Sequence, residues 1–328
     1  MKFSLSSALL LAGAVVGLSV AAPTVRAQDA SDYPNRDIRM IVPFPAGGGT
    51  DLVARVLADA LSAELGAAVY VDNIEGAAGA IGAAVAAAAE PDGYTILISA
   101  PGALTIAPHA TKDLSYEPQK SFEFVSMLTD APMMLAAPAN SPFNTTAELI
   151  EAAKAGEGAV SFASSGTGGN QHLNVVHLGN LAGVQFLHVP YQGGAPALLA
   201  LVGGQVDAQI ANYATIKGQI EGKELKLLAT TAASRLSIFP DLPTVAETVP
   251  GFDARNWVGA LVPAGVDQAI VAKIDAAFAE ALKDETVLKR LADVGWDPYY
   301  MPPAEFRAAV ATESALFHDV LEEAGLLP

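Results

Sequence analysis

The sequence predicts an α/β protein of two α/β lobes joined by two crossing segments. Short apolar strands alternate with amphipathic helices, and this alternation occurs twice along the chain. A long apolar segment, Phe124 to Pro138, separates the two occurrences and can pass from one lobe to the other. The chain has 328 residues, more than one hydrophobic core usually serves, so two domains are expected.

The first unit begins with Ile38 to Phe44, an apolar run typical of a buried strand. Apolar residues of Leu52 to Leu65 then recur on the i, i+4 rows of a helix, which Gly66 ends. The remaining segments are a strand (Val69 to Asn73), a helix (Ala80 to Ala89), a turn (Pro91 to Gly93) and a strand (Tyr94 to Ser99). These segments predict a βαβαβ unit.

The second unit repeats this order. Its expected strands and helices are Val160 to Ala163, Asn170 to Ala182, Phe186 to Val189, Ala195 to Val202 and Val206 to Ala211. Leu225 to Thr231 is interpreted as the return crossing. We therefore assign residues 28–128 and 232–328 to lobe 1 and residues 129–231 to lobe 2. Two crossings would form a hinge on which the lobes close.

The C-terminal part is expected to pack on lobe 1. A stretch with several prolines is followed by a predicted strand, Trp257 to Val262. Two amphipathic helices are then predicted, Gln268 to Val294 with a break and Pro303 to Ala324.

Residues 1–27 have the organisation of a cleaved signal peptide. Lys2 supplies the positive charge, Ala8 to Ala22 is apolar, and Val25 to Ala27 is a small-residue cleavage site. An uncleaved N-terminal anchor is the alternative. The signal predicts export of the mature chain.

The charge balance excludes some partners. Residues 1–27 contain Lys2 and Arg26 and no acid, so the remaining chain has 16 basic and 35 acidic residues, a net charge of −19. Nucleic acid and anionic membranes are poor partners for such a chain. Exposed charges are screened beyond about 8 Å, so an anionic ligand must be held by local donors. The chain has no cysteine, and its stability must come from buried apolar area.

The most informative segment is the glycine-rich loop from Pro43 to Asp51, between a predicted strand and a predicted helix. Its three glycines let the backbone approach a ligand, and the following helix start adds a partial positive charge. This favours an anion site without a basic residue. The alternative is a tight turn in which Thr50 or Asp51 caps the helix and Asp51 pairs with Arg55.

A second loop, Ser164 to Asn170, repeats the design in the second unit. Two such loops facing each other would hold both ends of a dianion. His172 follows this loop and either reaches the ligand or supports the loop. Asp207 either accepts a hydrogen bond from the ligand or is an ordinary turn residue. Phe44 and Tyr191 are expected in the cleft wall, or else in the lobe cores.

Catalytic and cofactor motifs are missing from the sequence. The glycines do not have the spacing of a dinucleotide or phosphate loop, and His172 and His177 are spaced i, i+5, which does not suit a metal. No metal or cofactor is expected. A nucleophile elbow is also missing. An exported hydrolase that uses Ser165 with His172 is the alternative from another functional class.

Several motifs together resemble the periplasmic solute-binding proteins of tripartite tricarboxylate transporters, the Bug family. The likeness covers nearly all of the mature chain. The motifs are Tyr33-Pro34, Ile41 to Pro45 with Gly47, Gly48 and Asp51, Val71 to Asn73, Gly76 to Gly79, Pro91 to Thr95, Ser165 to Gly168 with His172 and Leu173, and Val189 to Tyr191 before Gly193.

The resemblance implies a type II periplasmic-binding-protein fold that closes on a carboxylate and delivers it to the membrane subunits of a transporter. It implies a monomeric periplasmic protein that holds an organic mono- or dicarboxylate and is no enzyme. Family members bind one carboxylate largely through backbone amides and bridging waters. The corresponding residues here are Phe44, Ala46, Gly47, Gly48, Asp51, Ser165, Gly166, Gly168 and His172, followed by Ser99, Tyr191 and Asp207.

Two positions depart from the family pattern. Gly169 stands where the pattern usually has serine, and Val258 follows Trp257 where an aromatic residue is common. These departures concern the identity of the ligand and leave the expected fold unchanged. An amino acid or a phosphorylated solute is the alternative ligand.

Overall fold

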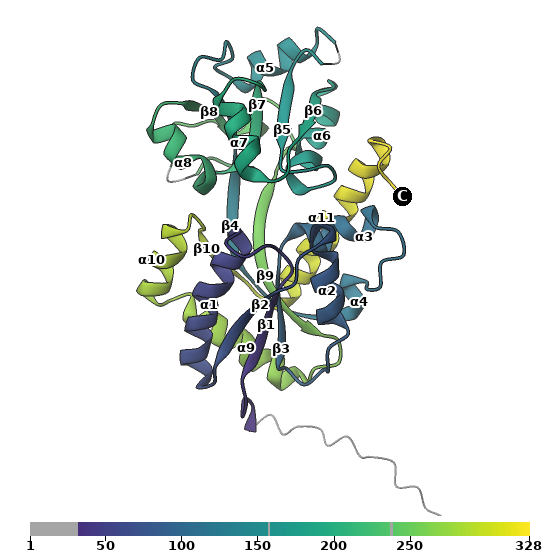
Figure 1. Ribbon diagram of the computed structural model, residues 1–328, viewed down its shortest axis with the longest axis vertical. Helices are drawn as coiled ribbons and strands as arrows, with labels where there is room; N and C mark the ends of the chain where they lie inside the picture. Colours follow the sequence, from purple (N-terminus) through teal and green to yellow (C-terminus); the bar gives the residue numbers. More distant parts are fainter. Residues whose placement is uncertain (1–31, 157, 237–238) are drawn as a thin grey trace, which may run out of the picture.

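The computed structural model describes residues 32–156, 158–236 and 239–328, and it has two lobes arranged along its longest axis (Figure 1). The signal peptide expected at residues 1–27 lies outside these residues. The expected architecture of two α/β lobes is confirmed.

The first lobe is built on parallel strands near the N-terminus. β1 pairs in parallel with β2 and β3, and β3 pairs antiparallel with β9. The elements before the crossing are β1 (Ile38–Val42), α1 (Gly49–Leu65), β2 (Val69–Asn73), η2 (Ala77–Gly79), α2 (Ala80–Ala87), β3 (Thr95–Ser99), η3 (Gly102–Ile106), α3 (Ala107–Ala110) and α4 (Pro118–Ser121). The predicted βαβαβ unit is confirmed, and the short helical elements after β3 were not predicted.

The second lobe repeats this organisation. β5 pairs in parallel with β6 and β7. Its elements are α5 (Thr146–Ala153), β5 (Ser161–Ser164), α6 (Asn170–Ala182), β6 (Leu187–Pro190), α7 (Gly194–Val202), β7 (Ala208–Asn212), α8 (Tyr213–Glu221), β8 (Leu225–Thr230) and η4 (Val245–Glu247).

Two strands connect the lobes, β4 (Phe122–Pro138) and β9 (Arg255–Pro263). The first part of β4 pairs with β9, and its last residues pair with β7 and β8. The return crossing expected at Leu225 to Thr231 was therefore wrong, because this segment forms β8 within the second lobe. Its apolar pattern suits a crossing strand and a lobe strand equally. The chain stays in the second lobe until Ala254, which is buried in that lobe's core.

Strand direction determines which loops face each other. β3 and β4 both run antiparallel to β9, so β1 and β3 point the same way as β4, toward the second lobe. β7 runs antiparallel to β4, and β5 and β6 are parallel to β7, so these strands point toward the first lobe. The carboxyl ends of both sets therefore lie at the edges where the lobes face each other.

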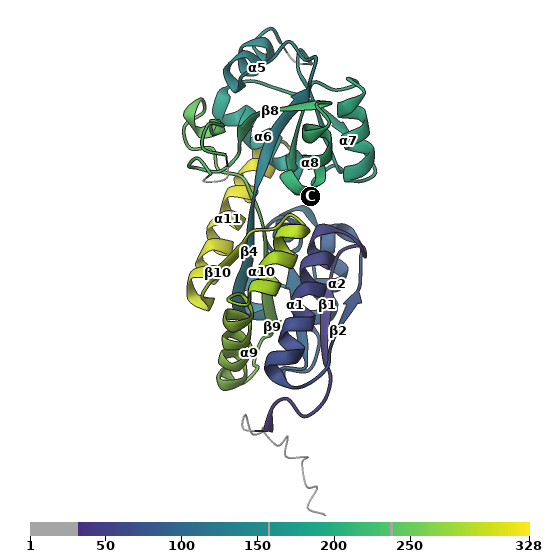
Figure 2. The same ribbon diagram turned by 90° about the vertical axis from the view of Figure 1, so that its left-hand side faces the viewer.

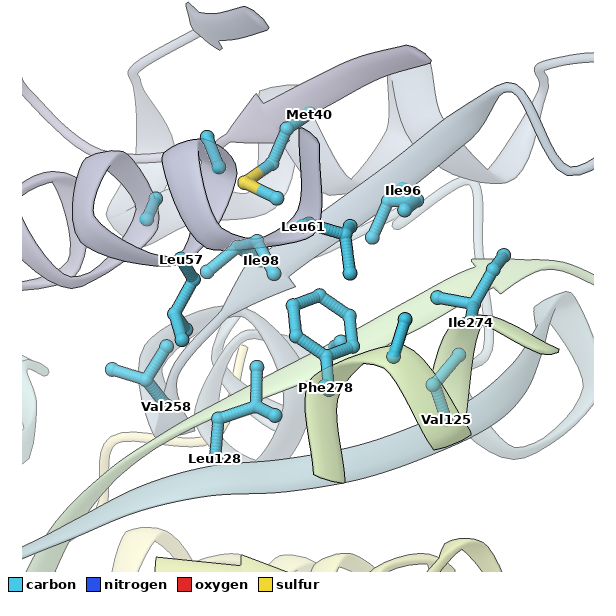
Figure 3. Packing of buried hydrophobic residues seen from close by; sticks show 14 of the residues in the cluster. Met40, Leu57, Leu61, Ile96, Ile98, Val125, Leu128, Val258, Ile274 and Phe278 are labelled. Atoms are coloured by element: carbon cyan, nitrogen blue, oxygen red, sulfur yellow. The ribbon is translucent and has the colours of Figure 1, made fainter. Parts of the chain in front are cut away.

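Each lobe has its own apolar core. Figure 3 shows the core of the first lobe, where Leu57 and Leu61 of α1 pack with Phe278 and with strand residues such as Ile98. In the second lobe, Phe162 and Ile210 pack with Phe252. Side chains such as these contribute about 1.5 to 3 kcal/mol each when fully buried.

The C-terminal elements are α9 (Gln268–Ala281), α10 (Glu285–Asp293), β10 (Pro298–Met301) and α11 (Pro303–Glu323). The break expected within 268–294 is confirmed, and α9 and α10 pack on the first lobe as expected, where they contact α1. α11 contacts η3 of the first lobe, the crossing strand β4 and also α6 of the second lobe (Figure 2). Within the described parts of the chain, no helix has both the length and the apolar character that crossing a membrane requires.

Candidate functional site

The first glycine-rich loop lies between β1 and α1, and Asp51 holds it in shape. The Gly47 N–H donates to Asp51 Oδ2 over 2.8 Å, and the Asp51 carboxylate also accepts hydrogen bonds from Arg55 Nε and Asn73 Nδ2 at 2.9 Å each. Burial acts to raise the pKa of Asp51, but the bonds from Arg55, Gly47 and Asn73 outweigh it and hold the pKa below its usual value. Asp51 is 1% exposed, so it is a structural brace for the loop.

The donors of this loop differ from those expected. The N–H groups of Gly47 and Gly48 donate to Asp51 and to the Pro45 carbonyl oxygen, so neither is free for a ligand. Gly48 is the N-cap residue of α1, and none of the described side chains caps this helix. The first N–H groups of a helix have no partner within the helix. The donors available to an anion are therefore those of Gly49, Thr50 and Asp51.

In the second loop, between β5 and α6, the N–H groups also have acceptors within the protein. The Ser165, Gly166 and Gly168 N–H groups donate to Gln171 Oε1, Ser164 Oγ and His172 Nδ1, at 3.0, 3.2 and 3.0 Å. Gly169 is the N-cap residue of α6, which also lacks a side-chain cap among the described residues. The available donors are those of the first turn of α6, which begins at Asn170.

Two histidines support the second loop. His172 and His188 are stacked with ring centroids 3.7 Å apart, and His188 Nε2 lies 2.6 Å from Ser164 Oγ. Because His172 Nδ1 accepts the Gly168 N–H, the proton of the neutral ring is on Nε2. Burial lowers the pKa of His172, and burial together with His172 lowers that of His188 to about 4. Both rings are neutral at pH 7.

The other predicted residues have different surroundings. Ser99 ends β3, is fully buried, and its Oγ has no hydrogen-bond partner among the described residues. The Phe44 ring lies where it would contact a side chain at Gly79, and Ala46 is exposed on the loop. Tyr191 follows β6, where its N–H donates to the Ser164 carbonyl oxygen. All of these lie at the facing edges of the lobes.

Asp207 is the exception, because the structure does not bring it to this edge. It precedes β7, and its carboxylate accepts hydrogen bonds from the Ser161 N–H and Oγ at 2.8 and 2.7 Å. Ser161 is the first residue of β5. Asp207 therefore lies at the amino ends of these strands, far from the loop that follows Ser164. The alternative interpretation, a structural turn residue, is the one that its contacts support.

Sequence reasoning missed two residues near the glycine-rich loops, Asn212 and Trp296. Asn212 ends β7, and its Oδ1 is buried without a partner in the described part of the molecule. It is the N-cap position of α8, and neither α7 nor α8 has a side-chain cap among the described residues. Trp296 packs against Gly49, 3.1 Å from where a Cβ would lie. The position of Asn212 directly after the predicted strand Val206 to Ala211 was the available signal.

The hydrolase arrangement that the sequence left open is not formed. The structure joins Ser164 to His188, while His172 Nδ1 is occupied by the Gly168 N–H. A histidine with a pKa of about 4 is a weak base at neutral pH. Within the described ranges, one group of side chains has the spacing of metal ligands, namely His318, Asp319 and Glu322 on α11, away from the glycine-rich loops.

The chain is similar to known proteins of one family. The family described as Tripartite tricarboxylate transporter family receptor matches residues 53–326. The chain is 35% identical to Protein BugT of Bordetella pertussis over 315 residues, which are 95% of this chain and 97% of BugT.

Two solved structures from Rhodopseudomonas palustris are also similar. Rpa4515 with adipate has a TM-score of 0.80 and 31% identity, covering 90% of this chain and 100% of that one. MatC with bound malate has a TM-score of 0.75 and 31% identity, covering 88% and 100%. The periplasmic-binding-protein fold expected from the sequence is therefore confirmed.

Proposed function

Because the chain belongs to the tripartite tricarboxylate transporter receptor family, we propose that it captures a small organic carboxylate between its lobes in the periplasm. The family is one of solute-binding receptors and not of enzymes. In this proposal, the chain is exported by cleavage after residue 27, acts as a monomer without chemical turnover, and delivers its ligand to the membrane subunits of a transporter.

The observation that carries the proposal is the set of uncapped helix starts at the facing edges. In the described chain, α1 of the first lobe and α6, α7 and α8 of the second begin without a side-chain cap. Each start offers free N–H groups and the positive end of a helix dipole. A carboxylate is the kind of group that such a start binds.

The braces explain how these donors stay in place. The glycine and serine N–H groups of the two loops donate within the protein, to Asp51, the Pro45 carbonyl oxygen, Gln171, Ser164 and His172, which leaves the helix starts as the ligand's donors. Buried Ser99 Oγ and Asn212 Oδ1 are further groups that a ligand or a bridging water can satisfy. A dicarboxylate would be held with one carboxylate at each lobe and would favour closure. The similar proteins that hold adipate and malate support this ligand class.

A panel of ligands tests the proposal by thermal unfolding. Adipate, malate and a series of monocarboxylates are compared with an amino acid, a phosphorylated sugar and a neutral sugar. A true ligand at 100 times its Kd should raise the free energy of unfolding by about 2.7 kcal/mol. Recovery of the ligand unchanged is expected, whereas its cleavage would favour a hydrolase. If no carboxylate stabilises the protein and another class does, the proposal is wrong.

A further inference from the structure

A pocket lies behind the crossing strands β4 and β9. It has a volume of about 610 Å³, and its walls come from β4, β9, β10, α6, α11 and the segment before β9. None of the residues 44–51 or 164–172 lines it. In Figure 2, α11 and β10 lie on one side of the crossing strands and α1 and α2 on the other. The volume is within the usual range for small-molecule sites, about 300 to 1,000 Å³.

The wall of this pocket combines acids with aromatic and sulfur-containing side chains. Asp130, Asp253 and Glu313 line it together with one cation, Arg255. Arg255 pairs with both aspartates through Asp130 Oδ2 and Asp253 Oδ1. The large uncharged residues in the wall are Met127, Trp257, Tyr299, Met301, Leu316 and Phe317. The wall therefore holds three acids and one arginine, and these large side chains give an apolar group a surface to pack on beside the polar Asn174, His177 and Thr312.

The acids keep unused capacity for a cation. The Asp130 side chain is 10% exposed, and its Oδ1 has no hydrogen-bond partner among the described residues. Among the described residues, the hydrogen-bond donors to Glu313 are uncharged, such as Trp257 Nε1 at 3.0 Å. Burial raises the pKa of Glu313 to about 7, and the nearby Asp130 and Asp253 act in the same direction.

We infer that this pocket binds a protonated organic amine whose apolar or aromatic part packs on Trp257, Tyr299 and Phe317, with its ammonium group near Glu313. Ammonium groups are attracted both to carboxylates and to aromatic faces. A bare inorganic cation would leave the apolar wall unused. The molecule would then have two sites of opposite preference, an anion site at the front of the hinge and a cation site behind it.

The two tryptophans make a direct test possible. Trp257 lies in this pocket and Trp296 lies against Gly49, so their two indole N–H signals in a ¹H–¹⁵N spectrum report on different sites. The whole mature protein is titrated with benzylammonium chloride and, separately, with benzyl alcohol and calcium chloride. We expect a saturable shift of the Trp257 signal with benzylammonium alone.

Two matched variants test whether Glu313 is the acid that holds the ammonium group. Glu313→Gln keeps an acceptor for the Trp257 indole and should weaken benzylammonium binding by about 10-fold or more. Glu322→Gln removes an exposed acid of the same helix and should change it less than about 2-fold. Adipate binding and the melting temperature of each variant verify its fold. The inference is wrong if benzylammonium gives no saturable shift, if benzyl alcohol or calcium matches it, or if Glu322→Gln weakens binding equally.

Discussion

The two glycine-rich loops have the same backbone plan, but different side chains hold them. In the first loop, the Gly47 N–H donates to the ionised Asp51, whereas in the second the Gly168 N–H donates to the neutral His172. Each brace is a residue in the first turn of the following helix. The helix starts are thus presented in the same way, while the first loop depends on a negative charge and the second on an uncharged ring.

Removing the charge of the first brace should have the largest effect. Asp51→Asn turns one acceptor oxygen into a donor that faces the Gly47, Arg55 or Asn73 donors. We expect the Kd for the carboxylate ligand to rise about 100-fold and the free energy of unfolding to fall by about 1 to 3 kcal/mol. Calorimetric titration and urea unfolding measure both.

Asp59→Asn is the matched control, because Asp59 is an exposed acid of the same helix that pairs with Arg290. The Asp59→Asn variant should bind the carboxylate ligand with the same affinity as the unmodified protein. Equal losses in both variants would mean that overall charge matters and that the brace does not.

Removal of the second brace, His172, should weaken ligand binding less than removal of the charge of Asp51. His172→Phe keeps a ring for stacking on His188 but leaves the Gly168 N–H without its acceptor. We expect about a 10-fold loss of affinity, since one uncharged hydrogen bond is lost. His109→Phe, which alters a histidine bonded to Ser314, is the control and should bind normally. Unchanged affinity of His172→Phe would show that the first loop alone determines binding.

The contributions of the two loops to stability should depend on pH in different ranges. The folded pKa of His188 is about 4 against 6.5 for a free histidine, so the unfolded chain binds more protons between these values. The stability that comes from the second loop is therefore full above pH 6.5 and falls as the pH drops toward 4. Asp51 has a folded pKa below 3.8, and its contribution is lost only as the pH falls further.

Melting temperatures of the unmodified protein and of His188→Phe, measured from pH 7 to 4.5, test this difference. The variant keeps a ring but cannot titrate, so its melting temperature should fall less steeply. Identical slopes would assign the acid sensitivity to other groups.

The smallest effects should come from the two glycines in the left-handed region. Gly47 has φ +78° and Gly168 has φ +74°, and a Cβ at either would have no described atom within 4 Å. Gly47→Ala and Gly168→Ala should each cost about 1 to 2 kcal/mol from backbone strain alone. Gly183→Ala, at φ +66° at the end of α6, should cost the same without changing affinity. Unequal costs at Gly47 and Gly168 would contradict the shared backbone plan.

Much of the fold could be predicted because its signals are local. The strand and helix of each βα unit follow from the spacing of apolar residues, so β1, α1, β5 and α6 lie close to the expected ranges. The return crossing predicted at Leu225 to Thr231 was wrong because the apolar pattern of a strand does not indicate which strand it pairs with. β4 pairs with it across about 90 residues of chain, which only tertiary packing decides.

By itself, the sequence determined the two α/β units, the position of both glycine-rich loops and the need for local donors on an acidic chain. Only the tertiary structure decided which N–H groups remain free. It assigned Asp51 and His172 to the loops as braces, separated Asp207 from them and formed the acidic pocket behind the hinge. The reason is physical: periodicity is set by neighbours along the chain, whereas hydrogen-bond partners and pocket walls are set by groups that folding brings together.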